Sequence, residues 1–595
     1  MTVERTIGSI LAVDCGTVIT KAMLLDRIDG EYRFVASGKA PTTLGPSGSS
    51  IIDGVLHAVE AISDTTGQQY FDESGDLVSA QNASTRTVGS LTDGVGALTA
   101  TVSCSEPLQL VLSGLVSDLS ISSARRAVSS TYSHIRAVLE GGSGASLDDE
   151  ERVRVIRTAA PDVVCIVGGI NGGAERPVLD SARAATLACA MIDRRERPTL
   201  VYAGNSQLRK QITQIVGDEA ELRVVDNVRP TLETEQLWEA EQEFQALFKQ
   251  RKMQQLSGMT TLTDWSPVPV LPTAQAFGQL IQYLWHLGDP ATGVLGIDVG
   301  GGNSTVAAVF DNQLHVTISG GLGVAFGGER LLEEEGFEAL ARWMPDSMPY
   351  DELQALLITK RVHPASIPAL NRELWVEQAV ACASIRSTLE TARPGWKPRA
   401  AQPYPDLTPL CDTILVSGSV LSQAPQPGQV ALVVLNAVEP IGVSTLVLDT
   451  YGLAPALGNV AALKPLAAVE ALDAGGFTNL ATIVAPVGGK AKPGDTVLQV
   501  SVSYADGSEL EVEVGYGSLE VLPLPLGQEA VLELHPRRGF DVGLGGRGTA
   551  GKRRVSGGLA GLIIDARGRP LPASYEPEKQ AERMQQWLYD VGGYG

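Results

Sequence analysis

Hydrophobic positions near the N-terminus follow the pattern of short strands separated by tight turns. One apolar run covers residues 10–13 and is followed by the turn Asp14-Cys-Gly-Thr17. A second apolar run covers 22–25, and the Asp29-Gly30 pair then predicts a hairpin into a third strand at 32–35. The N-terminal region is therefore expected to begin as an antiparallel sheet.

The same pattern recurs far downstream. A strand is predicted at 294–297, a glycine-rich turn at 298–304, a second strand at 305–310 and a third at 315–318. In both copies the first strand ends in an aspartate, and the chain returns through glycine as an antiparallel strand. Such an internal repeat predicts two related halves with a cleft between them.

The region between the two copies has a different pattern. Predicted strands at 163–167, 199–202 and 221–225 alternate with helices, including one over 176–191, as in a parallel α/β unit. The loop 168–173 lacks the spacing of a dinucleotide-binding loop, so we expect it to serve close packing. The turn 202–205 could contact a ligand or a partner, but Asn205 is at least as well placed to cap a helix. A further helix over 234–250 carries the apolar stripe Leu237, Ala240, Phe244, Leu247 and Phe248.

Alternation of hydrophobic and polar residues dominates the chain beyond about residue 463. They predict a hairpin over 496–504 and 510–514, a Gly/Arg/Lys-rich loop over 543–558 and a closing helix over 578–590. Within that loop, the basic run 546–554 could bind an anionic partner or mediate self-association, or it could simply be solvated. The sequence thus predicts an α/β fold in four parts. These are a first half (1–150), an inserted α/β region with connecting helices (151–290), a second half (291–462) and a β-rich C-terminal domain with a terminal helix (463–595).

Charge and composition narrow the class of protein. The 595 residues include 46 Lys and Arg against 68 Asp and Glu, a net charge of −22, which disfavours binding to nucleic acid or to an anionic membrane. The longest apolar run, 430–443, is interrupted by Asn436 and Glu439 and is too short to span a bilayer. The N-terminus lacks a signal-peptide pattern, and the six cysteines form no C-x-x-C pair. We expect a cytoplasmic protein without disulfides or structural zinc.

The first aspartate turn has the residue types that a nucleotide triphosphate needs. Gly16 lets backbone N–H groups approach a phosphate, Thr17 adds a hydroxyl, and Lys21 adds a positive charge. Asp14 at the strand end can orient hydrated magnesium, since that ion keeps several of its waters.

The second turn offers a matching set of groups. Its residues are Asp298, Gly300, Gly301, Gly302, Asn303, Ser304 and Thr305. A third element, the strand 414–417, runs into Gly418 and Ser419, where small residues would let an adenine ring lie against the backbone. Taken alone, either sequence is more commonly an ordinary turn than a phosphate-binding loop. Two such turns, each following a strand that ends in aspartate, favour a phosphate site shared by the two halves.

These motifs resemble the phosphate and adenosine motifs of the actin/Hsp70/sugar-kinase superfamily. Over residues 9–460 the chain is more narrowly similar to the MutL-like family, the L-type accessory proteins of coenzyme-B12-dependent glutamate mutase (unrelated to mismatch repair). The matching segments are Leu11–Lys21, Leu112–Leu119, Val167–Gly173, Tyr202–Asn205, Asp226–Pro230, Val270–Thr273 and Ile297–Gly302.

The resemblance implies a duplicated actin-like (ribonuclease H-like) ATPase core that binds ATP and magnesium. It implies that Asp14 and Asp298 handle magnesium and the attacking water, that Thr17 and Lys21 meet the phosphates, and that Gly418 meets the adenosine. The segment Gly327-Gly-Glu329 is similar to the one where a helix start closes over the nucleotide.

The chain departs from the family pattern at two places. Residues 303–305 read Asn-Ser-Thr where the family usually has Thr-Thr-Asp, and Gly418 stands where a double glycine is usual. Both departures favour slow hydrolysis, or binding without useful turnover. The chain also has no Asp-x-His-x-x-Gly run, the pattern that presents a histidine to cobalamin, so it is not expected to bind B12 itself.

By this resemblance, the expected function is that of an ATP-binding chaperone or reactivase for a B12-dependent mutase, and a weak ATPase at most. Two alternatives remain open at this point. A small-molecule kinase would use the same loops, although no catalytic base for an acceptor is identified. An actin-like or FtsA-like assembly protein would use nucleotide to control self-association.

Overall fold

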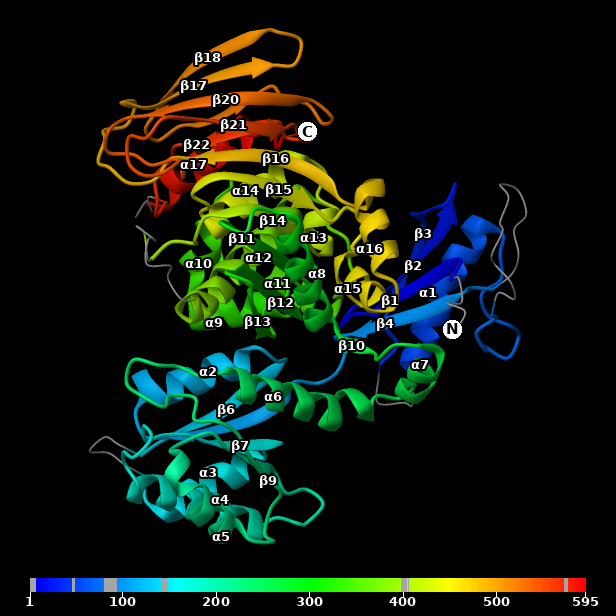
Figure 1. Cartoon of the computed structure of the whole chain (residues 1–595), viewed down its shortest axis with the longest axis vertical. Helices are drawn as coiled ribbons and strands as arrows, with labels where there is room; N and C mark the ends of the chain where they lie inside the picture. The colour runs from blue at the N-terminus through cyan, green and yellow to red at the C-terminus, as the bar shows by residue number, and fades with distance from the viewer. Residues whose placement is uncertain are drawn as a thin grey trace. The chain divides into compact units, whose positions relative to one another are not determined.

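The computed structural model describes residues 7–44, 49–79, 94–141, 147–396, 404, 406–571 and 576–594. The chain divides into two compact units, shown in Figure 1: Ser105–Met259, and the remainder formed by Met1–Cys104 with Thr260–Gly595. The inserted unit thus begins at 105 and ends at 259, where the sequence suggested 151 and 290. The earlier start follows from two additional strands, β5 (Leu108–Gly114) and β6 (Ser133–Glu140), which pair in parallel within the inserted sheet.

The first half is built on a five-stranded sheet of order β10-β4-β1-β2-β3. Its strands are β1 (Ser9–Cys15), β2 (Ile19–Ile28), β3 (Glu31–Pro41), β4 (Ala97–Val102) and β10 (Leu271–Pro272). Strand β1 is buried along its whole length, as expected for an apolar run with neighbours on both sides. It pairs antiparallel with β2 and parallel with β4.

The second half repeats this arrangement in an eight-stranded sheet of order β13-β12-β11-β14-β15-β16-β22-β19. Its strands are β11 (Gly293–Val299), β12 (Asn303–Phe310), β13 (Gln313–Gly320), β14 (Cys411–Ser417), β15 (Gly442–Leu448), β16 (Thr478–Ala485), β19 (Leu519–Leu522) and β22 (Leu562–Asp565). Strand β11 pairs antiparallel with β12 and parallel with β14, as β1 does with β2 and β4. The predicted duplication is therefore confirmed in the strand order.

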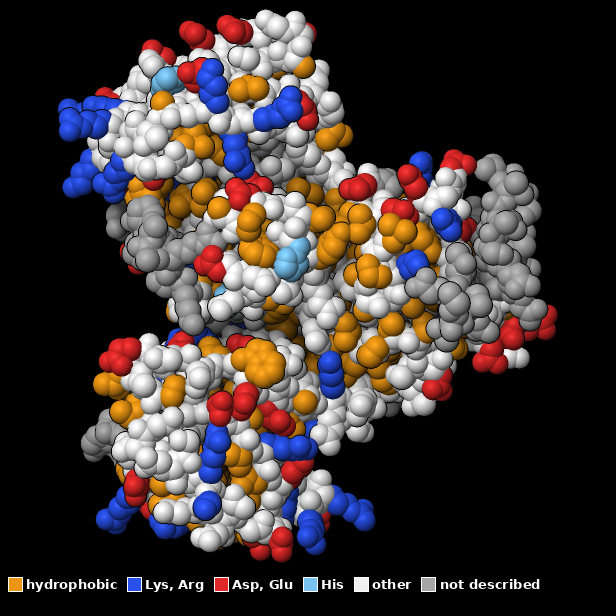
Figure 2. All heavy atoms as spheres, viewed as in Figure 1, with side chains coloured by type: hydrophobic (Ala, Val, Ile, Leu, Met, Phe, Trp, Pro, Cys, Tyr) orange, Lys and Arg blue, Asp and Glu red, His pale blue; other side chains and the backbone are white. Residues whose placement is uncertain are grey.

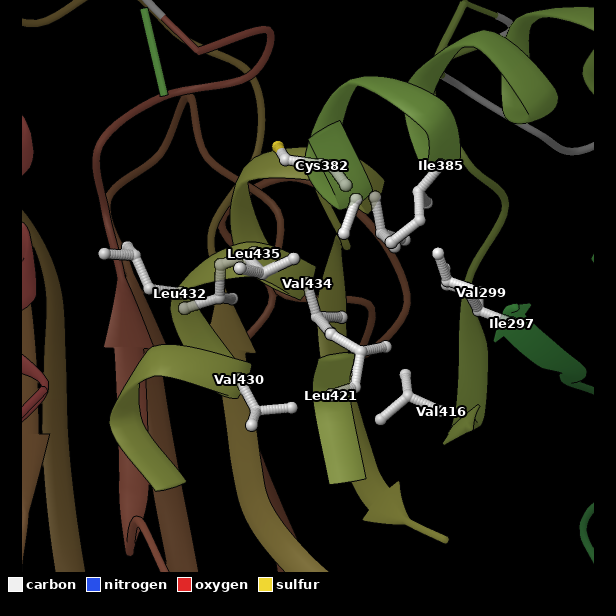
Figure 3. Close-up of a cluster of buried hydrophobic side chains, with 14 of the residues drawn as sticks. Ile297, Val299, Cys382, Ile385, Val416, Leu421, Val430, Leu432, Val434 and Leu435 are labelled. Atoms are coloured by element: carbon white, nitrogen blue, oxygen red, sulfur yellow. The ribbon is translucent and has the colours of Figure 1, made fainter. Parts of the chain in front are cut away.

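Helices cover both faces of the second sheet. Helices α8 (Thr273–Leu287), α15 (Ala454–Leu463) and α16 (Pro465–Ala471) contribute to one hydrophobic core that also includes residues of β1 and β2. Helices α12 (Asn371–Ala392) and α14 (Pro427–Val438) contribute to another core. Figure 3 shows part of it, with side chains of α12, α13 and α14 gathered beside those of β11 and β14.

This unit has six further α-helices among the described residues. They are α1 (Ile51–Thr66), α9 (Gly327–Glu334), α10 (Phe337–Ala341), α11 (Tyr350–Val362), α13 (Ser419–Ser422) and α17 (Pro577–Asp590). Helix α7 (Met259–Trp265) lies at the boundary of the two units. No helix among the described residues is long and apolar enough to cross a membrane.

The inserted unit is a parallel sheet of order β6-β5-β7-β8-β9, completed by β7 (Val163–Ile166), β8 (Thr199–Tyr202) and β9 (Leu222–Val224). Its helices are α2 (Ser122–Ser129), α3 (Asp149–Ala159), α4 (Arg176–Ala190), α5 (Arg209–Val216) and α6 (Trp238–Arg251). A Cβ on Gly168 would lie 2.7 Å from Leu115 Cγ, so this glycine permits close packing. The Asn205 side chain accepts a hydrogen bond from the backbone of Gln207, as expected of a cap.

The C-terminal segment contributes strands to two sheets. Strands β16, β19 and β22 extend the sheet of the second half, whereas β17 (Thr496–Tyr504), β18 (Glu509–Gly515), β20 (Glu529–Pro536) and β21 (Gly551–Ser556) form a separate sheet of order β18-β17-β20-β21. The expected loop over 543–558 is wrong in its second part, which is β21 and pairs with β20. Figure 2 shows Lys and Arg side chains on the part of the surface that carries β17 to β21, where Arg547, Lys552 and Arg554 are exposed.

Candidate functional site

The two aspartate turns are in direct contact within the larger unit. A Cβ built on Gly302 would lie 2.8 Å from both Cγ2 and Oγ1 of Thr17, and one on Gly301 would lie 2.4 Å from Val18 Cγ2. Glycine at 301 and 302 is thus required for the second turn to approach the first. The repeat recognised in the sequence therefore brings residues from the two halves to one place.

Asp14 is the last but one residue of β1 and is buried, with 5% of its surface exposed. Its Oδ1 accepts hydrogen bonds from the hydroxyls of Thr101 and Thr273, both at 2.8 Å. Thr101 is the register partner of Asp14 on β4, and Thr273 begins α8. These two bonds fix the orientation of the carboxylate, and Oδ2 has no hydrogen-bond partner among the described residues.

Asp298 occupies the corresponding position on β11 and has an unusual pKa. The pKa of this carboxyl is raised to about 6, chiefly by burial, and the negative charges of Asp14 and Asp449 act in the same direction. Lys21 and a hydrogen bond from Ser417 act in the opposite direction. Because charge interactions weaken with distance, these effects indicate that Asp14 and Lys21 of the first half share one electrostatic environment with Asp298 of the second.

Two other predicted glycines have steric roles in the turns. A Cβ on Gly16 would lie 2.5 Å from the Ile19 carbonyl oxygen, across its own hairpin. Gly418 follows β14 with φ +108°, and a Cβ there would lie 2.1 Å from the Val299 carbonyl oxygen. Gly300 closes the second turn by donating its N–H to the Asn303 carbonyl at 2.9 Å. The glycines therefore define the shape of the site.

The turns fit a phosphate group through their backbone donors. In the part of the chain that the structure describes, the N–H groups of Thr17, Val18, Gly301 and Gly302 have no hydrogen-bond partner. Such unpaired N–H groups in successive turn residues form anion-binding positions. They come from both halves and lie where the halves touch.

A magnesium ion would bind here mainly through groups that do not belong to the protein. No group of three or more His, Cys, Asp or Glu among the described residues could hold a metal ion. A magnesium ion here would be held by waters and phosphate oxygens, with Asp14 and Asp298 acting on its hydration shell, since this ion keeps several of its waters beside phosphates.

Three predicted site residues have other partners, and a fourth lies exposed at a helix start. The Thr17 hydroxyl donates to the Ser103 carbonyl at 3.1 Å, and the buried Ser304 hydroxyl donates to the Leu322 carbonyl at 2.7 Å. Glu329 forms an ion pair with Arg361 at 2.9 Å. Ser419 begins α13 and is exposed. None of these contacts joins the residue to Asp14 or Asp298.

The sequence interpretation missed a third aspartate. Asp449 follows β15 and is fully buried, and Ser417 Oγ donates to its Oδ2 at 2.8 Å. Strands β11, β14 and β15 are parallel neighbours, so Asp298, Ser417 and Asp449 lie at the same edge of the sheet. An aspartate after a buried strand was the signal used for Asp14 and Asp298, and it applied equally to Asp449.

Cys15 lies in the first turn but is a structural residue. It is fully buried, and burial raises the pKa of its thiol well above the ordinary value, with the charge of Asp14 adding to the effect. Since the thiolate is the reactive form, both burial and the raised pKa disfavour Cys15 as a nucleophile.

Comparison with known proteins identifies a family over most of the chain. The family model described as MutL protein matches residues 10–474. No curated protein matches the sequence at a significant level.

Solved structures give only distant matches. A glycerol dehydratase reactivase has 10% identity and a TM-score of 0.31, over 77% of this chain and 100% of that one. A gluconate kinase from Lactobacillus acidophilus has 11% identity and a TM-score of 0.29, over 78% and 91%. The activator of the 2-hydroxyisocaproyl-CoA dehydratase from Clostridium difficile, with bound ADPNP, has 10% identity and a TM-score of 0.26, over 77% and 95%. Similarity this low assigns no activity to the chain.

Proposed function

Since the chain belongs to the MutL protein family, we propose that it binds ATP with magnesium between its two aspartate turns and hydrolyses it slowly. The nucleotide cycle would open and close the two halves. In this way the protein would act as an accessory chaperone or reactivase for a coenzyme-B12-dependent mutase.

The observation that carries the proposal is the contact of the two turns. Thr17 lies against Gly302, and the unpaired N–H groups on both sides of this contact suit a chain of phosphates. A ligand that binds both turns would link the two halves, so its arrival and loss would bias their relative movement.

In the proposed complex, the N–H groups of residues 17, 18, 301 and 302 would bind phosphate oxygens and Lys21 would balance their charge. Bound magnesium would neutralise the remaining phosphate charge, with Asp14 and Asp298 orienting its waters. The Asp298 carboxylate, whose pKa is raised to about 6, is better matched than an ordinary aspartate to accept a proton from water near neutral pH. Gly418 would leave space for the adenosine.

Slow turnover is expected because the second turn has few groups that could position the attacking water. Residues 303–305 supply no carboxylate beside the second turn, and the Ser304 hydroxyl is already bound to the Leu322 carbonyl. The chain would therefore act through binding and slow release more than through rapid hydrolysis.

The proposed partner, a B12-dependent mutase, is tested by a reactivation assay. A B12-dependent mutase from the same organism would be inactivated by turnover and then incubated with this protein, free coenzyme and Mg-ATP. We expect activity to return with ATP and not with a non-hydrolysable analogue. The Asp14→Ala plus Asp298→Ala variant serves as the control. ATP binding without any recovery of mutase activity would contradict the accessory role while leaving the nucleotide site intact.

A further inference from the structure

Lys21 extends from the first half to a turn of the second half. It lies on β2 as the register partner of Asp14, yet a Cβ built on Gly452 would lie only 2.6 Å from its Nζ. Gly452 is in the turn that follows β15 and has φ +71°. The ammonium group therefore occupies the space that a side chain at 452 would take.

That turn is held rigidly by Asp449. Its Oδ1 accepts the N–H of Leu453 at 2.8 Å, and its Oδ2 accepts the N–H of Ala454 at 2.9 Å in addition to the Ser417 hydroxyl. The backbone N–H of Asp449 donates to the Val416 carbonyl at 2.9 Å. The carboxylate thus fixes the start of α15 and joins the turn to the end of β14.

The charges around Lys21 agree with this geometry. The positive charge of Lys21 lowers the pKa of both Asp298 and Asp449, against the larger effect of burial, and it also lowers the pKa of Lys39, its register partner on β3. The ammonium therefore lies in the field of carboxylates from the second half.

We propose that the turn from Asp449 to Gly452 is a seat for the Lys21 ammonium, which positions this lysine for a phosphate of the bound nucleotide. Asp449 and Gly452 are positioning residues in this account, which rests on the proposed function. A flexible lysine side chain loses conformational freedom when it binds a phosphate, so a seat that orders it beforehand favours binding.

The test is a double-mutant cycle between Gly452 and Lys21, with Mg-ATP affinity as the readout. Gly452→Ala places a methyl group where the ammonium lies. Gly67→Ala is the matched control, because Gly67 has φ +70° and nothing within 4 Å of its added Cβ. Both substitutions place alanine at nearly the same positive φ, and only the first displaces Lys21.

We expect Gly452→Ala to weaken Mg-ATP binding about tenfold, and Gly67→Ala to leave it unchanged. In the Lys21→Gln background the effect of Gly452→Ala should fall below about twofold. Adenosine, which has no phosphates, should bind all variants alike. If Gly452→Ala fails to fold, Gly452→Asn is compared with Gly67→Asn, because asparagine tolerates a positive φ.

Two unfavourable results are distinguishable. If the unmodified chain binds Mg-ATP but the effect of Gly452→Ala is the same with Lys21 and with Gln at 21, the seat is contradicted and the nucleotide site stands. If the unmodified chain binds no Mg-ATP, the proposed function fails and the seat fails with it.

Discussion

The side chain of Thr17 lies against the backbone of Gly302, so closely that a Cβ on Gly302 would come within 2.8 Å of two Thr17 atoms. The contact joins the first turn of one sheet to the first turn of the other. It holds the unpaired N–H groups of both turns side by side.

Gly302→Ala is expected to separate the two turns. The added methyl overlaps Thr17, and overpacking of this kind costs about 1–3 kcal/mol. We expect weaker Mg-ATP binding and a lower melting temperature, measured by calorimetry and by thermal unfolding. Gly288→Ala is the control, because the nearest atom to its added Cβ is at 3.6 Å. In the Thr17→Ala background the loss should be smaller, and an undiminished loss would contradict the contact.

Asp298→Asn should stabilise the protein without nucleotide at neutral pH. The folded-state pKa of Asp298, about 6, lies above its unfolded value near 4. The native state therefore binds more protons between these values, and stability falls as the pH rises through this window. Above it the ionised carboxylate costs the fold about 2–3 kcal/mol, which asparagine removes.

The measurement for Asp298→Asn is urea unfolding at several pH values. At pH 8 the free energy of unfolding of the variant should exceed that of the unmodified protein. This difference in stability should disappear towards pH 4. The exposed Asp64→Asn serves as the control. A difference that does not change with pH would show that the Asp298 carboxylate is not destabilised by burial.

Asp565 should be among the most important charges for stability. It is fully buried and accepts hydrogen bonds from Arg567 and Arg569 at 2.7 and 2.8 Å. These arginines hold its pKa well below the ordinary value despite burial, so the stabilisation is present above about pH 4 and is lost only in strongly acidic solution.

Replacing Asp565 leaves the two guanidinium groups without their shared carboxylate. Asp565→Asn is expected to cost about 3–5 kcal/mol in urea unfolding at pH 7, as for other broken buried pairs. The exposed Asp506→Asn should cost much less. A loss below about 1 kcal/mol for Asp565→Asn would contradict the buried network.

The cysteines should be unreactive in the native protein. Cys15, Cys165, Cys189, Cys382 and Cys411 are buried, and Cys104 is partly buried with a thiol pKa raised by burial to about 12. We expect a thiol reagent at pH 8 to label at most one cysteine slowly before unfolding, and all six in denaturant, as counted by mass spectrometry. Rapid native labelling of Cys15 would contradict the structural role of that residue.

The sequence predicted the parts of the fold that have a strong local pattern. The apolar runs that end in Asp14 and Asp298 became β1 and β11, because continuous apolar residues favour a strand buried on both faces. The stripe over 234–250 became α6, which begins at Trp238 and buries four of the five predicted residues. Repetition of the hairpin was sufficient to predict the duplicated strand order.

Other features depend on contacts that no local pattern contains. Thr101 and Thr273 reach Asp14 only because β4 and the start of α8 lie beside β1. Asp449 reaches Ser417 through parallel pairing of β14 with β15, and residues 105–150 join the inserted sheet through β5 and β6. The hydroxyls of Thr17 and Ser304 looked available in the sequence and are bound to carbonyl groups in the fold.

Titration calorimetry with Mg-ATP measures directly whether the two aspartate turns bind a nucleotide triphosphate. The unmodified chain is compared with Asp14→Ala plus Asp298→Ala, and folding of both proteins is checked by thermal unfolding. We predict that the unmodified chain binds one ATP and that the double variant loses this binding at least about a hundredfold, as removal of two groups acting on the same phosphates and metal should do. Unchanged ATP affinity in the folded double variant would contradict the site.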